Sequence, residues 1–321
     1  MPKQLWPARP VKKDPSPDDF GDPSLEISRI VIAPDGSALF AARLWDMDDF
    51  DQEHAVLFRV RDFAEPAERL CAIAKQIMDI ELSGGALWVL TEGALHRFAL
   101  NDLAKPAESI ELDGQTQRAF VTLDNGQRYV VGNNINWFDG KTWHTIEAEG
   151  EEDEFELLSV AASKDTAIAV GADGTILSLR DGKLTRIDAG VDDRLNSVRV
   201  DRDGVVWIAG ESGTRLRGSL ASIAKIEGEF DGDLNASCEL RGGVYWSAAS
   251  DEGGLYLDKG ATLERVFDEV CFELTATDDA IYASSAALVI RFTPSDAQAL
   301  SVDYDEETSK WTALPAEPIE E

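Results

Sequence analysis

The sequence predicts an all-β fold, a seven-bladed β-propeller of four-stranded antiparallel blades, on two observations. The first is the stretch VRVDRDGVVWIAGESG at 198–213, where two alternating apolar runs flank the pair Asp203-Gly204. An Asp-Gly pair between such runs is a strong hairpin signal. The second is that this unit recurs along the chain, with aromatic or aliphatic anchors at Trp88, Tyr129, Ile168, Trp207, Trp246 and Tyr282.

The spacing of these anchors decides the architecture. Successive anchors are separated by 41, 39, 39, 39 and 36 residues. A period near 40 residues, built from short strands, is typical of a propeller with one blade per repeat. The chain of 321 residues is therefore expected to form one repeat array.

The domain boundaries follow from composition. Residues 1–24 are rich in Pro, Lys and Asp, and are expected to form an irregular N-terminal arm. Residues 25–315 are expected to form a single propeller domain, followed by an acidic tail at 316–321. Blade one is expected to begin at Leu25, and the insertion WDMDDFDQEH at 45–54 lengthens this repeat.

The remaining blades follow in order. A strand is expected at 38–44 before the insertion and another near 56–60 after it. Blades two to six are expected at about 76–110, 118–146, 157–187, 195–226 and 235–266, and blade seven from about Cys271. Two candidates remain for the strand that completes the last blade, 310–314 and the N-terminal run Gln4-Leu5-Trp6.

The repeat motif also supports a family resemblance. The run DGVVWIAG at 203–210, the following Gly213 and the turn Asp181-Gly182-Lys183 resemble the repeats of seven-bladed bacterial sensor-type propellers. The resemblance covers roughly 25–315 and implies the architecture, not an activity, because propellers include enzymes, sensors and scaffolds. The regular Gly-His and Trp-Asp pairs of one scaffold family and the glycine and aromatic pattern of kelch repeats are both missing.

The charge balance restricts the partners. The chain has 30 basic and 61 acidic residues, which gives a net charge of −31. Such a protein repels phosphate backbones and anionic membrane surfaces, so we expect neither nucleic acid nor membrane as a partner. It attracts cations, basic peptides and basic proteins.

The cysteines and the N-terminus indicate a compartment. Cys71, Cys238 and Cys271 are an odd number, and all three lie in apolar runs. This usage favours reduced, buried thiols in a cytoplasmic protein. The first 17 residues contain no apolar stretch of the secretory kind.

The predicted topology allows the charges to be sorted by position. In a four-stranded blade, the loops between strands two and three and the linkers between blades share one face, and the remaining turns share the other. Most acidic loop residues fall on the first face, and only two basic loop residues, Lys75 and Arg194, are expected there. Solubility alone would also explain many acids, but it does not require them on one face.

We therefore expect the first face to bind a partner. Trp45 and Phe50 in the insertion are expected to act as anchors, whereas Phe155 and Phe230 either contact the partner or pack inward. The predicted partner-binding residues are Trp45, Asp46, Asp48, Asp49, Phe50, Asp51, Glu151, Glu152, Asp153, Glu154, Asp192, Asp193, Asp231, Asp233, Asp251, Glu252, Asp268 and Glu269.

Little in the sequence indicates a metal or cofactor. The run from Asp46 to Asp51 has alternating carboxylates as calcium loops do, but it has neither the central glycine nor the distal glutamate. We therefore expect no cofactor, and Ca²⁺ is a weakly indicated alternative. The pair Asp192-Asp193 and the run 231–233 would suit either a cation or the Lys and Arg of a partner.

The histidines do not suggest catalysis. His54 is expected in the insertion, His96 on a third strand and His144 on an edge strand, all as surface or edge residues. No catalytic residue is predicted. The rival hypotheses are a metal-dependent propeller lyase or hydrolase that uses funnel carboxylates, and a sensor or scaffold module.

The favoured hypothesis is a non-catalytic binding protein whose acidic face captures a basic protein. Its most concrete form is a bacterial immunity protein that neutralises a cationic toxin by occlusion. We expect it to be a monomer before the complex forms.

Overall fold

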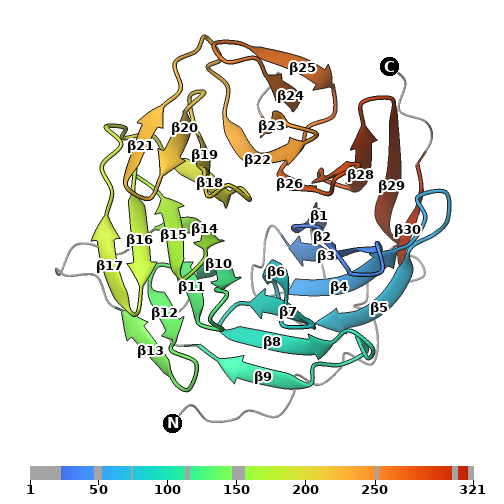
Figure 1. Ribbon diagram of the computed structural model, residues 1–321. Coiled ribbons are helices and arrows are strands. Elements are labelled where there is room, and N and C mark those ends of the chain that lie inside the picture. The colour runs from blue at the N-terminus through green and yellow to red at the C-terminus, as the bar shows by residue number, and fades with distance from the viewer. Residues whose placement is uncertain are drawn as a thin grey trace. The chain divides into compact units, whose positions relative to one another are not determined.

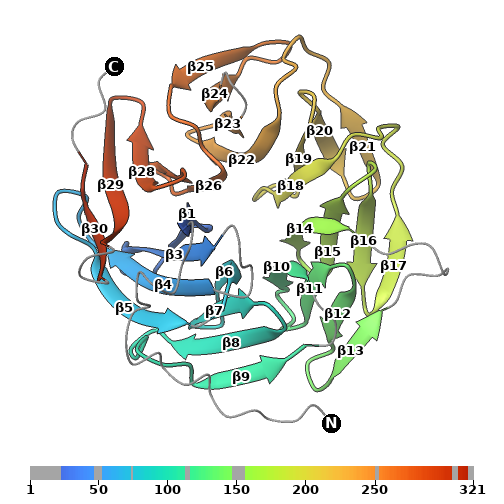
Figure 2. The same ribbon diagram turned by 180° about the vertical axis from the view of Figure 1, so that it is seen from behind.

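The computed structural model describes residues 23–46, 53–73, 75–112, 116–146, 156–249, 253–305 and 310–316. These residues form strands β1–β30 and no helix, and the strands make seven antiparallel sheets in chain order (Figures 1 and 2). The fold is a seven-bladed β-propeller, which confirms the predicted fold class. The chain divides into two compact units, one with blades three to six and one with blades seven, one and two.

Blades three to six each contain four strands in consecutive order. Their bounds are β10 (Gln117–Thr122), β11 (Arg128–Gly132), β12 (Ile135–Phe138) and β13 (Trp143–Ile146); β14 (Leu157–Ser163), β15 (Thr166–Gly171), β16 (Ile176–Arg180) and β17 (Lys183–Arg186); β18 (Leu195–Val200), β19 (Val206–Gly210), β20 (Arg215–Ser219) and β21 (Ser222–Lys225); β22 (Leu234–Leu240), β23 (Gly243–Ala248), β24 (Gly254–Asp258) and β25 (Leu263–Phe267). The boundaries predicted from the repeat agree to within about two residues.

The core of this unit lies between consecutive sheets. The second strand of each blade is almost entirely buried; in β15 and β19 every residue is buried. Alternate side chains of such a strand point to opposite faces, so one strand supplies apolar groups to both neighbouring sheets. Ile168 of β15 thus belongs to the cluster shared with blade five, and Ala169 to the cluster shared with blade three.

The second unit contains the irregular blades. Its strands are β26 (Glu273–Ala276), β27 (Ile281–Ser284), β28 (Leu288–Thr293), β29 (Asp296–Asp305) and β30 (Lys310–Pro315) of blade seven; β1 (Pro23–Ile27), β2 (Val31–Ile32), β3 (Ala38–Asp46), β4 (Glu53–Val60) and β5 (Glu68–Ile73) of blade one; and β6 (Ile77–Ser83), β7 (Ala86–Thr91), β8 (Ala94–Ala99) and β9 (Glu108–Glu111) of blade two. Blade one has five strands because both β1 and β2 pair with β3, and blade seven has five because β30 adds to β29.

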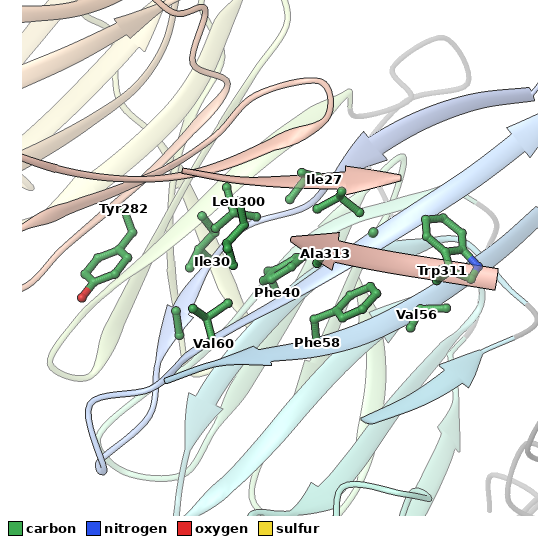
Figure 3. Packing of buried hydrophobic residues seen from close by; sticks show 14 of the residues in the cluster. Ile27, Ile30, Phe40, Val56, Phe58, Val60, Tyr282, Leu300, Trp311 and Ala313 are labelled. Atoms are coloured by element: carbon green, nitrogen blue, oxygen red, sulfur yellow. The ribbon is translucent and has the colours of Figure 1, made fainter. Parts of the chain in front are cut away.

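Strand β30 joins blade seven to blade one. Trp311 and Ala313 pack into the cluster that contains Phe40 and Phe58 of blade one (Figure 3). The backbone N–H of Ala67 also donates to the carbonyl of Ala313 at 2.9 Å. Of the two candidate closing strands, 310–314 is therefore an edge strand of the last blade, while Gln4-Leu5-Trp6 lies outside the described residues.

The insertion in blade one is shorter than predicted. Strand β3 continues to Asp46 and β4 begins at Glu53, with Trp45 and Glu53 as register partners. The two strands of this hairpin thus extend into the segment that was expected to be a loop. Backbone pairing between them continues beyond the alternating apolar residues from which the strand ends were predicted. His54 consequently lies on β4 and not in an insertion loop.

Candidate partner-binding site

The strand topology of blades four to six separates two kinds of loop. In blade five the loop 211–214, between β19 and β20, and the linker 226–233, after β21, lie at the same end of the sheet because consecutive strands are antiparallel. The turns 201–205 and 220–221 lie at the opposite end. We call the first the linker end and the second the turn end of a blade.

Acidic side chains recur at the linker end of blades four to six. In the described loops there, the basic residue is Arg194, and its Nη1 lies 2.6 Å from Oε1 of Glu156. The acids in these loops are Asp173, Asp188, Asp192, Asp193, Glu211, Glu227, Glu229, Asp231, Asp233, Asp268 and Glu269. The turn end of blade five is mixed, since Arg202 stands between Asp201 and Asp203.

Six of the predicted partner-binding residues belong to this set. Asp192, Asp231, Asp233 and Asp268 are exposed, whereas Asp193 and Glu269 are half-buried. Exposed carboxylates in loops are available to the cationic groups of a partner.

Three of these carboxylates also have partners within the protein. Oδ1 of Asp268 lies 3.3 Å from Nε of Arg265. Oδ2 of Asp193 accepts a hydrogen bond from the hydroxyl of Thr214 at 2.6 Å and lies 3.8 Å from Nζ of Lys225. Oδ1 of Asp233 accepts from the backbone N–H of Ser212 at 3.0 Å. The loop 211–214 thus contacts the linker on each side, which brings Asp193 and Asp233 to one loop.

The sequence reasoning missed this bridging role. The backbone N–H of Gly213 also donates to the carbonyl of Gly232 at 2.9 Å, and a Cβ atom at Gly213 would lie 1.7 Å from the carbonyl oxygen of Phe230. The repeated Gly-x-x-Gly-Thr pattern at 171–175 and 210–214 is the signal that would have identified it. Glycine is needed there because the backbones approach closely and φ is positive.

The other predicted residues are not placed to the same extent. Trp45 and Asp46 lie at the end of β3, so their backbone position is known. The remainder lie outside the described residues, namely Asp48, Asp49, Phe50, Asp51, Glu151, Glu152, Asp153, Glu154, Asp251 and Glu252. Their assignment to a partner-binding surface stays a prediction.

Phe230 packs inward. Its ring is 5.0 Å from that of Tyr256 in an edge-on arrangement, and it lies against the cluster formed by Trp207 and Trp246. Of the two alternatives left open for this residue, the structure favours packing between blades five and six. Phe155 lies outside the described residues.

Two histidines correct the sequence prediction. His54 and His96 were expected at a surface or edge, but they are only 4% and 5% exposed. Nδ1 of His54 accepts from the indole N–H of Trp311 at 3.2 Å, and His96 lies between the hydroxyls of Thr91 and Ser109 at 3.1 and 2.8 Å. Strand β30, far away in the sequence, covers His54, so no local pattern could reveal its burial.

Burial lowers the pKa of both His54 and His96 to about 4, so both imidazoles are neutral at pH 7. His144 lies on the edge strand β13 and is exposed, as predicted, with Nε2 3.1 Å from Oδ2 of Asp139. The same Nε2 faces the hydroxyl of Thr142 at 3.0 Å. A relay needs the two partners on opposite ring nitrogens, so this trio lacks that arrangement.

The thiols are poor nucleophiles. Cys71, Cys238 and Cys271 are free and buried, and burial raises the pKa of each to about 12. Because the reactive species is the thiolate, such thiols are inert near neutral pH.

The described residues contain no group of three or more His, Cys, Asp or Glu side chains that could hold a metal ion. Asp192, Asp193, Asp231 and Asp233 therefore do not form such a group. The calcium-like run 46–51 lies mostly outside the described residues. The part of the chain that the structure describes also has no helix able to cross a bilayer.

Comparisons with known proteins show the fold alone. No protein-family model and no curated protein sequence matches this chain. Two similar solved structures are extracellular domains from B. thetaiotaomicron, of a hybrid two-component system (TM-score 0.63, 11% identity, 82% of this chain) and of a one-component system (TM-score 0.64, 11% identity, 98% of this chain). The chain spans 37% and 48% of their lengths. The Pan2 WD40 domain of Neurospora crassa is similar at TM-score 0.57 and 11% identity, over 81% of this chain and 86% of that domain.

Proposed function

We propose that this protein is a non-catalytic binding module that captures a basic protein through the linker-end loops of its blades. The solved structures similar to it include the extracellular domains of a two-component and a one-component system and a WD40 domain, and this likeness is consistent with a binding or sensor role. The observation that carries the proposal is the excess of exposed acids over bases in the linker-end loops of blades four to six.

The physical basis is electrostatic steering. A surface with many carboxylates and few cations raises the association rate of a cationic partner, and this gain falls as salt screens the charges. Asp192 and Asp231 occupy matching places in two consecutive linkers, so they present carboxylates at the period of the blades. Aromatic anchors in a charged rim add affinity, and Trp45 and Phe50 would serve as such anchors.

In its most specific form the proposal is an immunity protein. A cationic toxin such as a nuclease exposes a basic substrate groove, and a carboxylate-rich surface seated over that groove would occlude it. The protein would then act in the bacterial cytoplasm as a monomer until the partner binds. A toxin reading frame beside the gene would support this form.

A salt-resolved capture experiment with charge variants tests the proposal. The immobilised protein is incubated with lysate at low and high salt, and bound proteins are identified. We expect a basic partner that high salt releases. The double variant Asp192→Asn with Asp231→Asn removes two linker-end charges and should weaken capture of that partner by about tenfold or more.

The matched control is Asp203→Asn together with Asp165→Asn, which removes the same charge from the turn ends of blades five and four. It should leave capture nearly unchanged. A partner that is acidic or insensitive to salt, or equal loss of capture in both double variants, would overturn the proposal.

A further inference from the structure

A cross-strand row in blade five places two guanidinium groups beside one indole. The register pairs Arg199 of β18 with Trp207 of β19, and Trp207 with Arg217 of β20. Residues paired in this way lie on one face of the sheet. The guanidinium carbons of Arg199 and Arg217 lie 5.4 and 4.7 Å from the centroid of the Trp207 ring, within cation–π range.

The same row in blade two is neutralised. There the register aligns Glu81, Trp88, Arg97 and Glu108 across β6 to β9. Arg97 has an acid at the next position, with its Nε 3.4 Å from Oε2 of Glu108. In blade five the corresponding fourth-strand residue is Ala224. An arginine replaces the first acid of the blade-two row, and an alanine replaces the second.

The two arginines of blade five are short of partners. Arg217 is exposed, and no carboxylate among the described residues lies within ion-pairing distance of it. Arg199 is half-buried; its Nε donates to Oγ of Ser237 at 3.3 Å, but its Nη2 is buried without a hydrogen-bond partner. A buried donor left unsatisfied is costly, so an acceptor that reached Nη2 would stabilise Arg199. The donors exposed to a ligand are those of Arg217.

The nearby acids do not supply that acceptor. Both oxygens of Asp201 are engaged, Oδ2 by the indole N–H of Trp207 at 3.0 Å and Oδ1 by the backbone N–H groups of Val205 and Asp203 at 2.8 and 3.0 Å. Glu239 is exposed and on the same strand as Ser237. It attracts the Arg199 guanidinium electrostatically, as Asp201 does, but among the described residues neither carboxylate lies within ion-pairing distance of it. Burial lowers the pKa of Arg199, while the nearby Cys238, Asp201 and Glu239 act in the opposite direction.

We propose that Arg199, Arg217 and Trp207 form an oxyanion site on blade five that takes a phosphate or carboxylate group. Planar guanidinium groups recognise both oxyanions through paired N–H donors. The indole contacts both groups and leaves the donors of the exposed Arg217 available to a ligand. The site lies on a different set of residues from the linker-end acids and takes a ligand of opposite charge. It is therefore independent of the proposed capture of a basic protein.

Isothermal titration calorimetry with two probes tests the site. Inorganic phosphate and succinate are titrated separately into the whole protein in a low-chloride buffer. We expect saturable binding of at least one probe, and the tighter of the two identifies the phosphoryl or the carboxylate source. Arg217→Gln should weaken that binding by about tenfold or more, since it removes a charge-assisted, bidentate donor.

Arg97→Gln is the matched control, because it makes the same change at the same register position of blade two, where Glu108 already neutralises the arginine. It should bind the probe as the unchanged protein does. Arg217→Lys keeps the charge and should give intermediate affinity, because lysine lacks the planar fork. The proposal is wrong if neither probe binds saturably, if Arg217→Gln binds normally, or if Arg97→Gln loses as much affinity.

Discussion

Blades two and five share a plan but differ in how they handle charge and close contact. Both place a tryptophan at the same register position, Trp88 on β7 and Trp207 on β19, with an arginine on the next strand. In blade two that arginine has an acidic neighbour, whereas in blade five it does not. The two blades therefore share the same strand arrangement and the same tryptophan and arginine positions. The residues paired with them on the first and fourth strands differ.

The loops of the two blades differ as well. Gly93, between β7 and β8, has open space around it, whereas Gly213, between β19 and β20, is pressed against the carbonyl of Phe230. Both glycines have positive φ, 71° and 67°. A glycine with positive φ thus lies in a free loop in one blade and in a bridge between linkers in the other.

The largest effect is expected from this loop difference. Gly213→Ala places a Cβ atom against the Phe230 carbonyl and also strains a positive φ, so it should reduce the free energy of unfolding by about 3 kcal/mol or more. Gly93→Ala keeps only the strain and should cost about 1 kcal/mol. Chemical denaturation of both variants measures the difference. Equal losses would mean that the bridge contributes nothing.

A pH effect is expected from His96 of blade two, whose counterpart in blade five is Leu216. The folded protein holds the pKa of His96 near 4, below the unfolded value of about 6.5, so the unfolded state binds more protons between these limits. The contribution of His96 is therefore complete above about pH 6.5 and falls by about 1.4 kcal/mol per pH unit toward pH 4.

His96→Gln retains hydrogen-bonding capacity and cannot titrate. The stability difference between the two proteins, followed by denaturation from pH 7.5 to 4.5, should shift in favour of the variant as the pH falls. His54 provides an independent test of the same pH effect, since it is also a buried histidine and its Nδ1 accepts a hydrogen bond from Trp311. A difference that stays constant with pH would show that His96 is not held neutral.

A smaller loss is expected when the indole N–H of blade five is removed. Trp207→Phe deletes the hydrogen bond to Oδ2 of Asp201 and part of the ring surface that the two arginines contact. It should reduce the free energy of unfolding by about 1–2 kcal/mol. Combining it with Asp201→Asn tests the cause by a double-mutant cycle. Strict additivity of the two losses would exclude the hydrogen bond as their link.

The smallest stability effects concern the arginines themselves. Arg97→Gln breaks a partly exposed ion pair and should cost under about 1 kcal/mol, with the loss fading at high salt. Arg217→Gln removes only a cation–π contact, so its loss should be of similar size and less sensitive to salt. Thermal melts at two salt concentrations compare them. A strong salt dependence of the loss in Arg217→Gln would instead mean that Arg217 pairs with a carboxylate.

The repeat made most of the fold predictable. Blades two to six began and ended within about two residues of prediction because each contains its own alternation and turn signals, such as Asp203-Gly204 before β19. Blade one was less accurate, since its first strand is divided into β1 and β2 and its hairpin extends to Trp45 and Glu53. Backbone pairing with a partner strand decided those ends.

The candidate site was predictable only as a distribution of charge. The sequence located acids in linkers, but it did not distinguish Asp192, which is exposed, from Asp193, which binds Thr214. Nor did it indicate that Arg199 and Arg217 meet at one ring. These contacts depend on the register between paired strands. Knowing where each strand lies in the sequence does not determine that register.

The sequence by itself determined the number of blades, their order and the apolar second strand of each, because a period near 40 residues and a two-residue alternation are local properties. The tertiary structure alone decided that β30 covers His54 across 257 positions and that two arginines flank Trp207 without an acid between them. These contacts join residues that are far apart in the sequence or on different strands. The local sequence around each residue does not indicate its partner, so the contact is set only by how the strands pair and pack.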